Sequence, residues 1–288
     1  MAAILEAPAS FRSSAHRLGP LDLLREAVWE VLSRRRLIRY LVQADLKAKG
    51  ASTLLGNLWW VIDPLLLMSV YVVLVSIIFQ RSQPDYPLFV FAAILPWKWF
   101  RASTRDALGS VRSQNRLIQQ IKFPKIVLPI AAASSGIAHF AFGLIPLTGL
   151  LLVFFPHRAS LYVLLLPAVA LVQFVFTMAL ALFLSAANVF FRDVAILSRR
   201  GIRLWFYLSP GLYSVAHVNE IAGRNEWIGV LMGLNPFTTL FEAYRAVVYT
   251  GTMPDWRALV LLLAASLGLL VIGTWFFKRL EPSFAKVL

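Results

Sequence analysis

The sequence predicts an all-α integral membrane protein with six transmembrane helices, an N-terminal amphipathic interface helix and re-entrant helices before the last span. Three observations lead to this fold. The 288-residue chain is 59% hydrophobic and only 15% charged, whereas a soluble domain has roughly 25% charged residues. Apolar runs recur at the length of a bilayer span, and basic residues gather between alternate runs. Because the net charge of +14 belongs to these loops, it favours a membrane surface, and not nucleic acid, as the partner.

The first 56 residues contain no long apolar run, so we expect no cleavable signal peptide. Residues 1–20 are expected to form a disordered tail. Residues 21–56 are a cytoplasmic lead-in, in which a basic amphipathic helix over about 24–42 lies along the lipid surface; a solvated helix is the alternative. The apolar positions at helical spacing are Leu24, Ala27, Val28, Val31, Ile38, Leu41 and Val42.

The transmembrane domain is expected over residues 57–280, because a helix needs about 20 mostly apolar residues to cross the bilayer. The second and fifth candidate spans are short and contain Pro96 and Pro210, respectively. The six candidate spans are Leu58–Phe79, Pro87–Phe100, Ile126–Phe155, Leu161–Phe191, Ile202–Val215 and Ala258–Phe277.

The region of about 218–250 is apolar, but Asn235-Pro236 breaks it and it carries Glu242 and Arg245. It therefore predicts re-entrant or interfacial helices and not a full span.

The distribution of Lys and Arg gives the orientation. Most of the 28 basic residues precede the first span or follow the second, fourth and sixth. This pattern predicts that both termini are cytoplasmic, including a tail over 281–288. It also makes Asn188–Arg203 a short cytoplasmic loop. A polar helix over about 102–122 would lie on the same side as a docking site for a soluble partner, with an ordinary basic loop as the alternative.

The sequence contains few residue patterns that indicate catalysis, nucleotide binding or metal binding. It has no Gly-x-x-x-x-Gly-Lys-Ser/Thr element, no HExxH or GxSxG motif, and no cysteine. The spans hold almost no ionisable side chain apart from Asp63 and His139, which disfavours an ion-coupled carrier. We therefore expect no catalytic residue, no metal ligand and no cofactor on this chain.

Aromatic side chains gather near the predicted span ends. Most are explained by an interfacial belt. Trp97, Trp99 and Tyr207 lie in the short, broken spans, so they are candidates to face inward, where aromatic faces could pack against the C–H surfaces of sugars.

Six blocks, taken together and in order, resemble the permease subunit of ABC exporters for cell-surface polysaccharides, the Wzm-like family of O-antigen, teichoic acid and galactan exporters. The resemblance covers roughly residues 35–288. The blocks are LGNLWWVIDPLLLM (55–68), YPLFVFAAILPWKWF (86–100), LIQQIKFPKIVLPI (117–130), NVFFRDV (188–194), LNPFTTLFEAYRAVVYTG (234–251) and FFKRLEPSFAKVL (276–288).

The resemblance implies a homodimer in the bacterial inner membrane, joined to a separate ATPase subunit that binds ATP and Mg²⁺. The dimer would pass lipid-linked polysaccharide to the outer side. The helix over 102–122 then corresponds to the coupling helix that docks on the ATPase. The docking residues would be Ser113, Gln114, Asn115 and Arg116.

One departure from the family concerns the run Asp45–Gly50, which lacks the usual Arg and Tyr before the first span. Arg101 and Arg105 are therefore our candidates for the lipid pyrophosphate, because they lie where the second span meets the cytoplasm and carry fixed charge suited to phosphate. Two alternatives remain open. One is an ABC efflux permease for small molecules or drugs. The other is a membrane-embedded glycosyltransferase or lipid phosphatase, for which Asp193 and Glu242 are isolated carboxylates.

Overall fold

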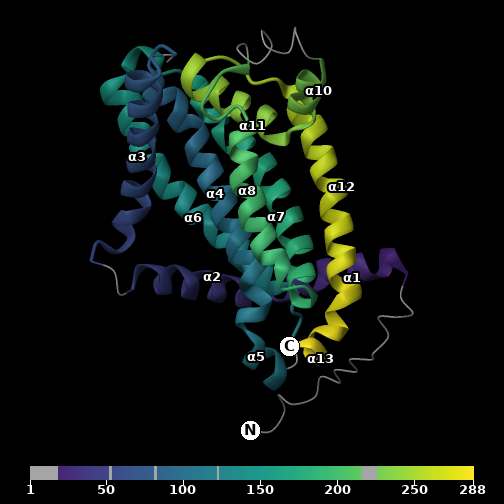
Figure 1. The fold of residues 1–288 in the computed structure, drawn as a ribbon. Coiled ribbons are helices and arrows are strands. Elements are labelled where there is room, and N and C mark those ends of the chain that lie inside the picture. Colours follow the sequence, from purple (N-terminus) through teal and green to yellow (C-terminus); the bar gives the residue numbers. More distant parts are fainter. Residues whose placement is uncertain (1–18, 52–53, 81–82, 122, 216–225) are drawn as a thin grey trace.

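The computed structural model describes residues 19–51, 54–80, 83–121, 123–215 and 226–288 (Figure 1). Within these ranges the chain is helical and forms no strand, which confirms the predicted all-α class. Residues 1–18 of the predicted tail lie outside the described residues, as does the part of the predicted re-entrant region before Glu226.

Two helices, α1 (Pro20–Ser33) and α2 (Arg35–Gly50), lie across one end of the helix bundle (Figure 1). The predicted amphipathic segment over 24–42 is thus divided between two helices that meet at Arg34. Helix α1 buries Leu23 and Ala27 and packs against the last long helix, whereas α2 packs against α6. Helix α2 buries no residue, and Trp29 and Leu32 of α1 and Tyr40 of α2 stay exposed, so both helices rest on the bundle but keep apolar side chains on their outer side.

Four helical segments in the described part of the chain are long and apolar enough to cross a membrane. They match four of the six spans expected from the sequence, and they contain the helices α3 (Trp59–Val72), α6 (Val127–Gly149), α7 (Leu166–Phe190) and α12 (Trp256–Leu280). The segments extend over Gly56–Ile78, Val127–Phe154, Leu161–Phe190 and Trp256–Val287.

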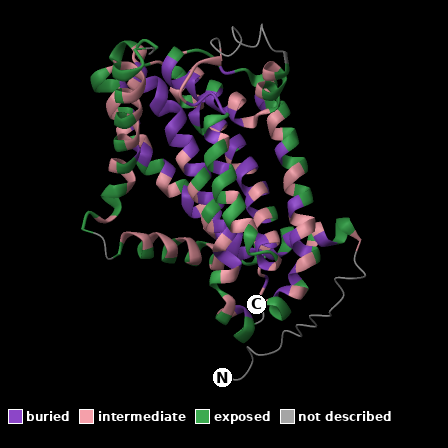
Figure 2. Cartoon of the chain, viewed as in Figure 1, coloured by how far each residue is buried: buried purple, intermediate pink, exposed green. Residues whose placement is uncertain are grey.

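Helix α4 (Tyr86–Ser113) is the centre of the bundle. Its first half is almost fully buried between α3, α6, α7 and α11, whereas the outer helices α3 and α12 have few buried residues (Figure 2). The sequence predicts a short span here, broken at Pro96, but the helix continues through Pro96 into the polar region. Buried Gln173 of α7 donates a hydrogen bond to the Pro96 carbonyl oxygen at 2.7 Å, which satisfies a polar group inside the bundle.

Glycines set the closest helix contacts, as is usual in membrane bundles. A Cβ atom at Gly136 of α6 would lie 1.9 Å from Ser103 Oγ of α4. A Cβ atom at Gly273 of α12 would lie 2.9 Å from the Ala179 carbonyl oxygen of α7. Because the second neighbour is backbone, it cannot give way as a side chain can.

Helix α8 (Asp193–Tyr207) follows α7 after only Phe191 and Arg192. The sequence analysis places Asn188–Arg203 in a loop, and the structure corrects this. The helix begins at Asp193, whose carboxylate lies in the first turn, where negative charge is favoured. The basic residues Arg199 and Arg203 are therefore on a helix and not in a loop.

Helices α10 (Glu226–Leu234) and α11 (Pro236–Arg245) lie at the end of the bundle opposite α1 and α2 (Figure 1). Buried Arg245 donates hydrogen bonds to the carbonyl oxygens of Pro210 (2.6 Å) and Gly211 (2.7 Å), and its guanidinium carbon lies 3.7 Å from the centre of the Phe89 ring. This arginine therefore joins the turn after α8 to α11 and α4.

An ion cluster joins the other end of the bundle to α1. Lys278 of α12 contacts Glu30 at 2.9 Å, Glu281 at 2.9 Å and Glu26 at 3.2 Å. Lys278, Glu30 and Glu281 are all buried, so one buried ammonium group faces two buried carboxyl groups and a more exposed one. Burial and the nearby Glu281 carboxylate raise the pKa of the Glu30 carboxyl group to about 7, although Lys278 acts in the opposite direction.

Replacing Gly273 by alanine should separate α12 from α7, because the new Cβ would press on the Ala179 backbone oxygen. We expect the free energy of unfolding in detergent micelles to fall by about 1–3 kcal/mol. The matched control is Gly268→Ala on the same helix, where a Cβ meets nothing within 4 Å. Equal stability of the two variants would contradict the close contact.

The Glu30→Gln variant tests the ion cluster through its pH dependence. Because the pKa of Glu30 is higher in the folded protein, the folded state binds this proton more tightly than the unfolded state. The resulting stabilisation is complete below the ordinary pKa of a glutamate and is lost as the pH rises through 7. The unfolding free energy of Glu30→Gln minus that of the wild type should therefore increase between pH 5 and pH 8, on the order of 1–3 kcal/mol. Glu26→Gln is the control, since the Glu26 side chain is 40% exposed. Parallel curves for Glu30→Gln and wild type would contradict the prediction.

Candidate functional site

Two cavities border α4 in the part of the helix that carries its positive charge. The first, of about 460 Å³, is enclosed by α2, α3, α4 and α6 and is called the aromatic cavity after Trp59, Trp60, Trp99 and Phe140. The second, of about 320 Å³, lies between α4, the end of α7 and α8, and is called the arginine cavity after its four arginines. Arg105 lines both cavities.

The rings of the aromatic cavity hold one another in place. Trp99 stacks on Phe140 with ring centres 4.6 Å apart, and Trp60 meets His139 edge to face at 4.2 Å. Two nitrogen atoms, Trp99 Nε1 and His139 Nε2, are buried and have no hydrogen-bond partner in the described part of the chain. The cavity therefore combines aromatic faces with unpaired polar atoms, a lining typical of small-ligand sites.

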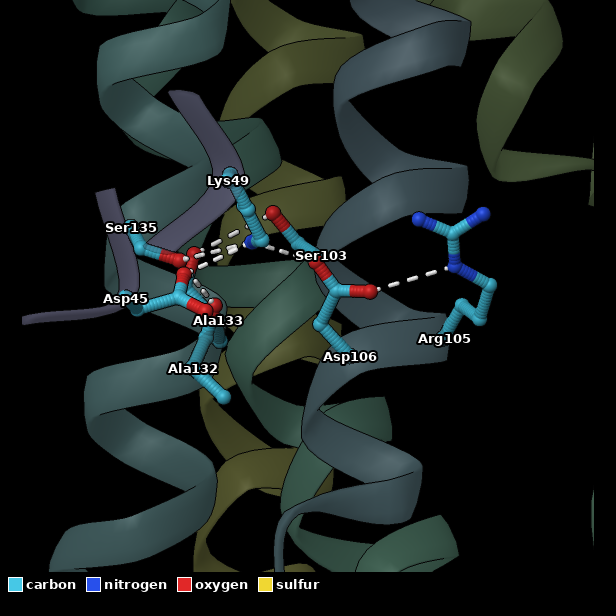
Figure 3. A network of polar contacts seen from close by, with 8 residues as sticks. All are labelled: Asp45, Lys49, Ser103, Arg105, Asp106, Ala132, Ala133 and Ser135. Atoms are coloured by element: carbon cyan, nitrogen blue, oxygen red, sulfur yellow. Dashed lines mark hydrogen bonds and ion pairs between the residues drawn. The ribbon is translucent and has the colours of Figure 1, made fainter. Parts of the chain in front are cut away.

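The charges near the aromatic cavity are paired. Lys49 of α2 lies 2.7 Å from both Asp45 and Asp106, and Arg105 Nε donates to Asp106 Oδ1 at 3.1 Å (Figure 3). Lys98 forms an ion pair with Asp63. Lys49, in the run Asp45–Gly50, therefore joins α2 to α4 and, through Ser135 at 3.5 Å, to α6.

The arginine cavity has the opposite electrostatics. Arg101 and Arg105 are one helical turn apart on α4, and Arg199 and Arg203 are one turn apart on α8, so each pair lies on one helix face. No acidic residue lines the cavity within the described residues. Among these four arginines only Arg105 has an acidic partner in the described chain, Asp106, and its outer nitrogen atoms point away from the Lys49 network (Figure 3).

Two buried polar side chains complete the arginine cavity. Thr104 is fully buried, and its hydroxyl group has no hydrogen-bond partner in the described chain. Asn188, only 3% exposed, donates from Nδ2 to the Leu108 carbonyl oxygen at 2.8 Å, while its Oδ1 atom is unpaired among the described residues. A fixed hydroxyl donor therefore accompanies four guanidinium groups.

The three candidate aromatic residues lie in different places. Trp99 lines the aromatic cavity. Trp97 is buried in the core, with its ring centre 4.6 Å from that of Phe237, and it lines neither cavity. Tyr207, at the end of α8, is 55% exposed. Within one chain the structure therefore does not bring these three side chains together, and their contact with substrate stays a prediction.

The proposed docking residues lie where α4 ends and α5 (Asn115–Gln120) begins, at the end of the bundle that also holds the C-terminus (Figure 1). Ser113, Gln114 and Arg116 are exposed, and Asn115 Nδ2 donates to the Leu288 carbonyl oxygen at 2.9 Å. The residues thus form an exposed polar tip, and docking there stays a prediction.

Arg101 and Arg105 are candidates from the sequence, and their role stays a prediction. The structure places Arg199, Arg203 and Thr104 in the same cavity, which the sequence did not predict. Arg199 and Arg203 are four residues apart in the sequence. This spacing puts two side chains on one face only if the segment is a helix, and the sequence predicts a loop. Nothing in the sequence indicates that Thr104 faces α8, because that contact depends on how the helices pack.

Together, the four long apolar helical segments of the described chain indicate an integral membrane protein. No group of metal-binding side chains occurs in the residues that the structure describes. No family model matches the chain. It is 32% identical to the O-antigen export system permease protein RfbA of Myxococcus xanthus over 259 residues, which cover 90% of this chain and 98% of that protein. The chain belongs to the family of O-antigen export permeases.

Two further relatives agree with this assignment. Two proteins of Klebsiella pneumoniae, both also described as O-antigen export system permease protein RfbA, are 28% and 26% identical to the chain. Each alignment covers 88% of this chain and 95% of the relative. The similarity to each of these relatives therefore extends over most of the chain.

The Lys49→Met variant tests the network that joins α2 to the bundle. It would leave Asp45 and Asp106 without their ammonium partner, so the free energy of unfolding should fall by about 1–3 kcal/mol. Amide hydrogen exchange in α2 should become faster at the same time. Lys47→Met, on the exposed side of α2, is the control. If both variants behave alike, Lys49 does not hold α2.

Proposed function

We propose that the chain is the permease subunit of an ATP-driven ABC exporter that moves lipid-linked polysaccharide from the cytoplasmic to the outer side of the bacterial inner membrane. The observation that carries the proposal is the similarity to O-antigen export permeases over 90% of the chain. The wholly helical, membrane-type bundle supports it. No nucleotide-binding motif occurs in the sequence, so ATP and Mg²⁺ would bind to a separate ATPase subunit.

The proposal includes six spans, with α4 and α8 added to the four long apolar segments. Burial of α4 among its neighbours supports this, because a helix shielded from lipid can carry polar residues that a lipid-facing helix cannot. Helices α10 and α11 would be the re-entrant part on the outer side. The basic end with α1, α2 and α5 would face the cytoplasm, and both termini with it.

A second copy of the chain is the proposed partner within the membrane. Helix α3 and its π-helical extension Val73–Ile78 leave an apolar face open, in which Leu66, Val70, Val73 and Ile77 are exposed. Only 6% of the residues in the 18-residue apolar window of this span are buried in the single chain. A homodimer would cover part of that face and leave the rest for lipid.

The ATPase would dock on the exposed tip around Gln114 and Arg116. The tip lies beside the C-terminal helix α13 (Phe284–Val287), through the contact of Asn115 with Leu288. A force on this tip would pass directly into α4, because α4 ends at Ser113. That helix borders both cavities, so the arrangement supports a link between ATP hydrolysis and the path of the glycan.

The aromatic cavity supports a saccharide as cargo. Aromatic faces pack against the C–H surfaces of sugar rings, and Trp59 and Trp60 line this cavity together with Trp99. Trp99 is the residue that both the sequence and the cavity favour. Tyr207 is exposed and would meet the cargo in the dimer, whereas Trp97 is buried in the core of the single chain.

The test is deletion of the gene followed by complementation with the wild-type chain. We expect loss of the surface polysaccharide, accumulation of lipid-linked glycan inside the cell, and recovery on complementation. The purified chain should hydrolyse no ATP without its ATPase partner. Normal surface glycan in the deletion strain together with lost efflux of a small molecule would contradict the proposal, and so would robust ATP hydrolysis by the lone chain.

A further inference from the structure

We propose that the arginine cavity between α4 and α8 is a binding site for a diphosphate group. The inference rests on the proposed function in one respect, since it takes the diphosphate to be the link between a polyprenyl lipid and its glycan. The site is formed by Arg101, Arg105, Arg199 and Arg203, with Thr104 at its base.

The arrangement of charge is the first argument. Like charges one turn apart on a helix repel each other, and here two such pairs face the same cavity. The positive-inside pattern requires only that arginines lie on the cytoplasmic side of the membrane. It does not require arginines of two helices to line the same cavity. Since no acidic residue of the described chain lines the cavity, a bound anion is what would neutralise them. A guanidinium group donates two parallel hydrogen bonds to phosphate oxygens. Four guanidinium groups therefore suit the two phosphate groups of a diphosphate.

The buried hydroxyl group of Thr104 is the second and independent argument. An unpaired buried hydroxyl group costs free energy unless something bonds to it. Thr104 lines the cavity, is fully buried, and has no partner in the described chain. A phosphate oxygen in the cavity would accept its hydrogen bond.

The contrast between the two cavities indicates how the ligand would lie. Around the aromatic cavity Lys49 and Lys98 are paired with carboxylates, so no excess positive charge remains there for an anion. Arg105 lines both cavities. A diphosphate would therefore bind in the arginine cavity and not in the aromatic cavity. The volume of about 320 Å³ falls within the ordinary range for ligand pockets, roughly 300–1,000 Å³.

The experiment is isothermal titration of the purified full chain in nanodiscs of neutral phosphatidylcholine. The probes are inorganic pyrophosphate, farnesyl diphosphate and farnesol. We expect both diphosphates to bind and farnesol not to bind. Tighter binding of farnesyl diphosphate would identify a lipid headgroup as the source, whereas equal affinities would identify a free diphosphate. Binding of farnesol alone, or of no probe, would overturn the site.

Variants test which residues form the site. The double variant Arg199→Gln/Arg203→Gln should bind farnesyl diphosphate at least about tenfold more weakly, because it loses charged hydrogen bonds. Arg200→Gln removes one charge from the same exposed helix but does not line the cavity, so it should bind like the wild type. Wild-type affinity in the double variant, or an equal loss in Arg200→Gln, would overturn the proposal. An unchanged thermal unfolding midpoint shows that the variants are folded.

Two further variants separate the site from a general effect of charge. Arg199→Lys/Arg203→Lys keeps the charge but not the forked geometry, so its affinity should lie between those of the wild type and the glutamine variant. Thr104→Val keeps the shape of the side chain and removes the hydroxyl group, so it should weaken binding several-fold. If Thr104→Val binds farnesyl diphosphate with wild-type affinity, the Thr104 hydroxyl group does not contact the ligand.

Complementation of the deletion strain distinguishes this inference from the proposed function. If the wild-type chain restores surface polysaccharide and Arg199→Gln/Arg203→Gln does not, while Arg200→Gln does, both are supported. If the glutamine variant restores the glycan and binds diphosphate normally, the arginine site is wrong and the exporter stands. If deletion leaves the surface glycan unchanged but the titration still depends on the arginines, the exporter is wrong and the anion site stands.

Discussion

Burial of α4 is the constraint on which the rest of the structure depends. The interior of a bilayer has no water, so the backbone polar groups of a helix at its centre must be satisfied within the protein. Here Gln173 bonds to the carbonyl oxygen of Pro96, and Ser103 Oγ of α4 donates to that of Ala133 at 3.1 Å. With these contacts α4 stays continuous through a proline, and the exposed Arg101 and Arg105 follow its buried half.

The two sides of α4 differ in how this charge is balanced. Towards α3 and α6, carboxylates pair with Lys49 and Lys98, and aromatic rings enclose the remaining space. Towards α8, the guanidinium groups face one another and no described carboxylate lines the space. One helix thus separates a nearly neutral cavity from a cationic one. That division suits a ligand with a sugar at one end and a phosphate group at the other.

The two ends of the bundle are held by buried cations of different kinds. At one end Lys278 holds α1 to α12 through carboxylates. At the other, Arg245 holds the turn after α8 through carbonyl oxygens and lies over Phe89. Removing one partner of a buried charge is costly, because it leaves the other partner unpaired. These contacts fix the positions of α1 and of the turn after α8 relative to the core.

The sequence by itself determined the all-α class, four of the spans and the candidacy of Arg101, Arg105 and Trp99, because bilayer length, apolar content and fixed charge are local properties. Only the tertiary structure decided that α4 continues through Pro96, that Asn188–Arg203 is mostly helical, and that Trp97 lies in the core. It also decided that Lys49 meets Asp106, and that Arg101 and Arg203 share a cavity. Helical periodicity shows which residues share a face, but it does not show which helix that face meets. That choice depends on packing between distant segments, down to the absence of a Cβ at Gly136 and Gly273.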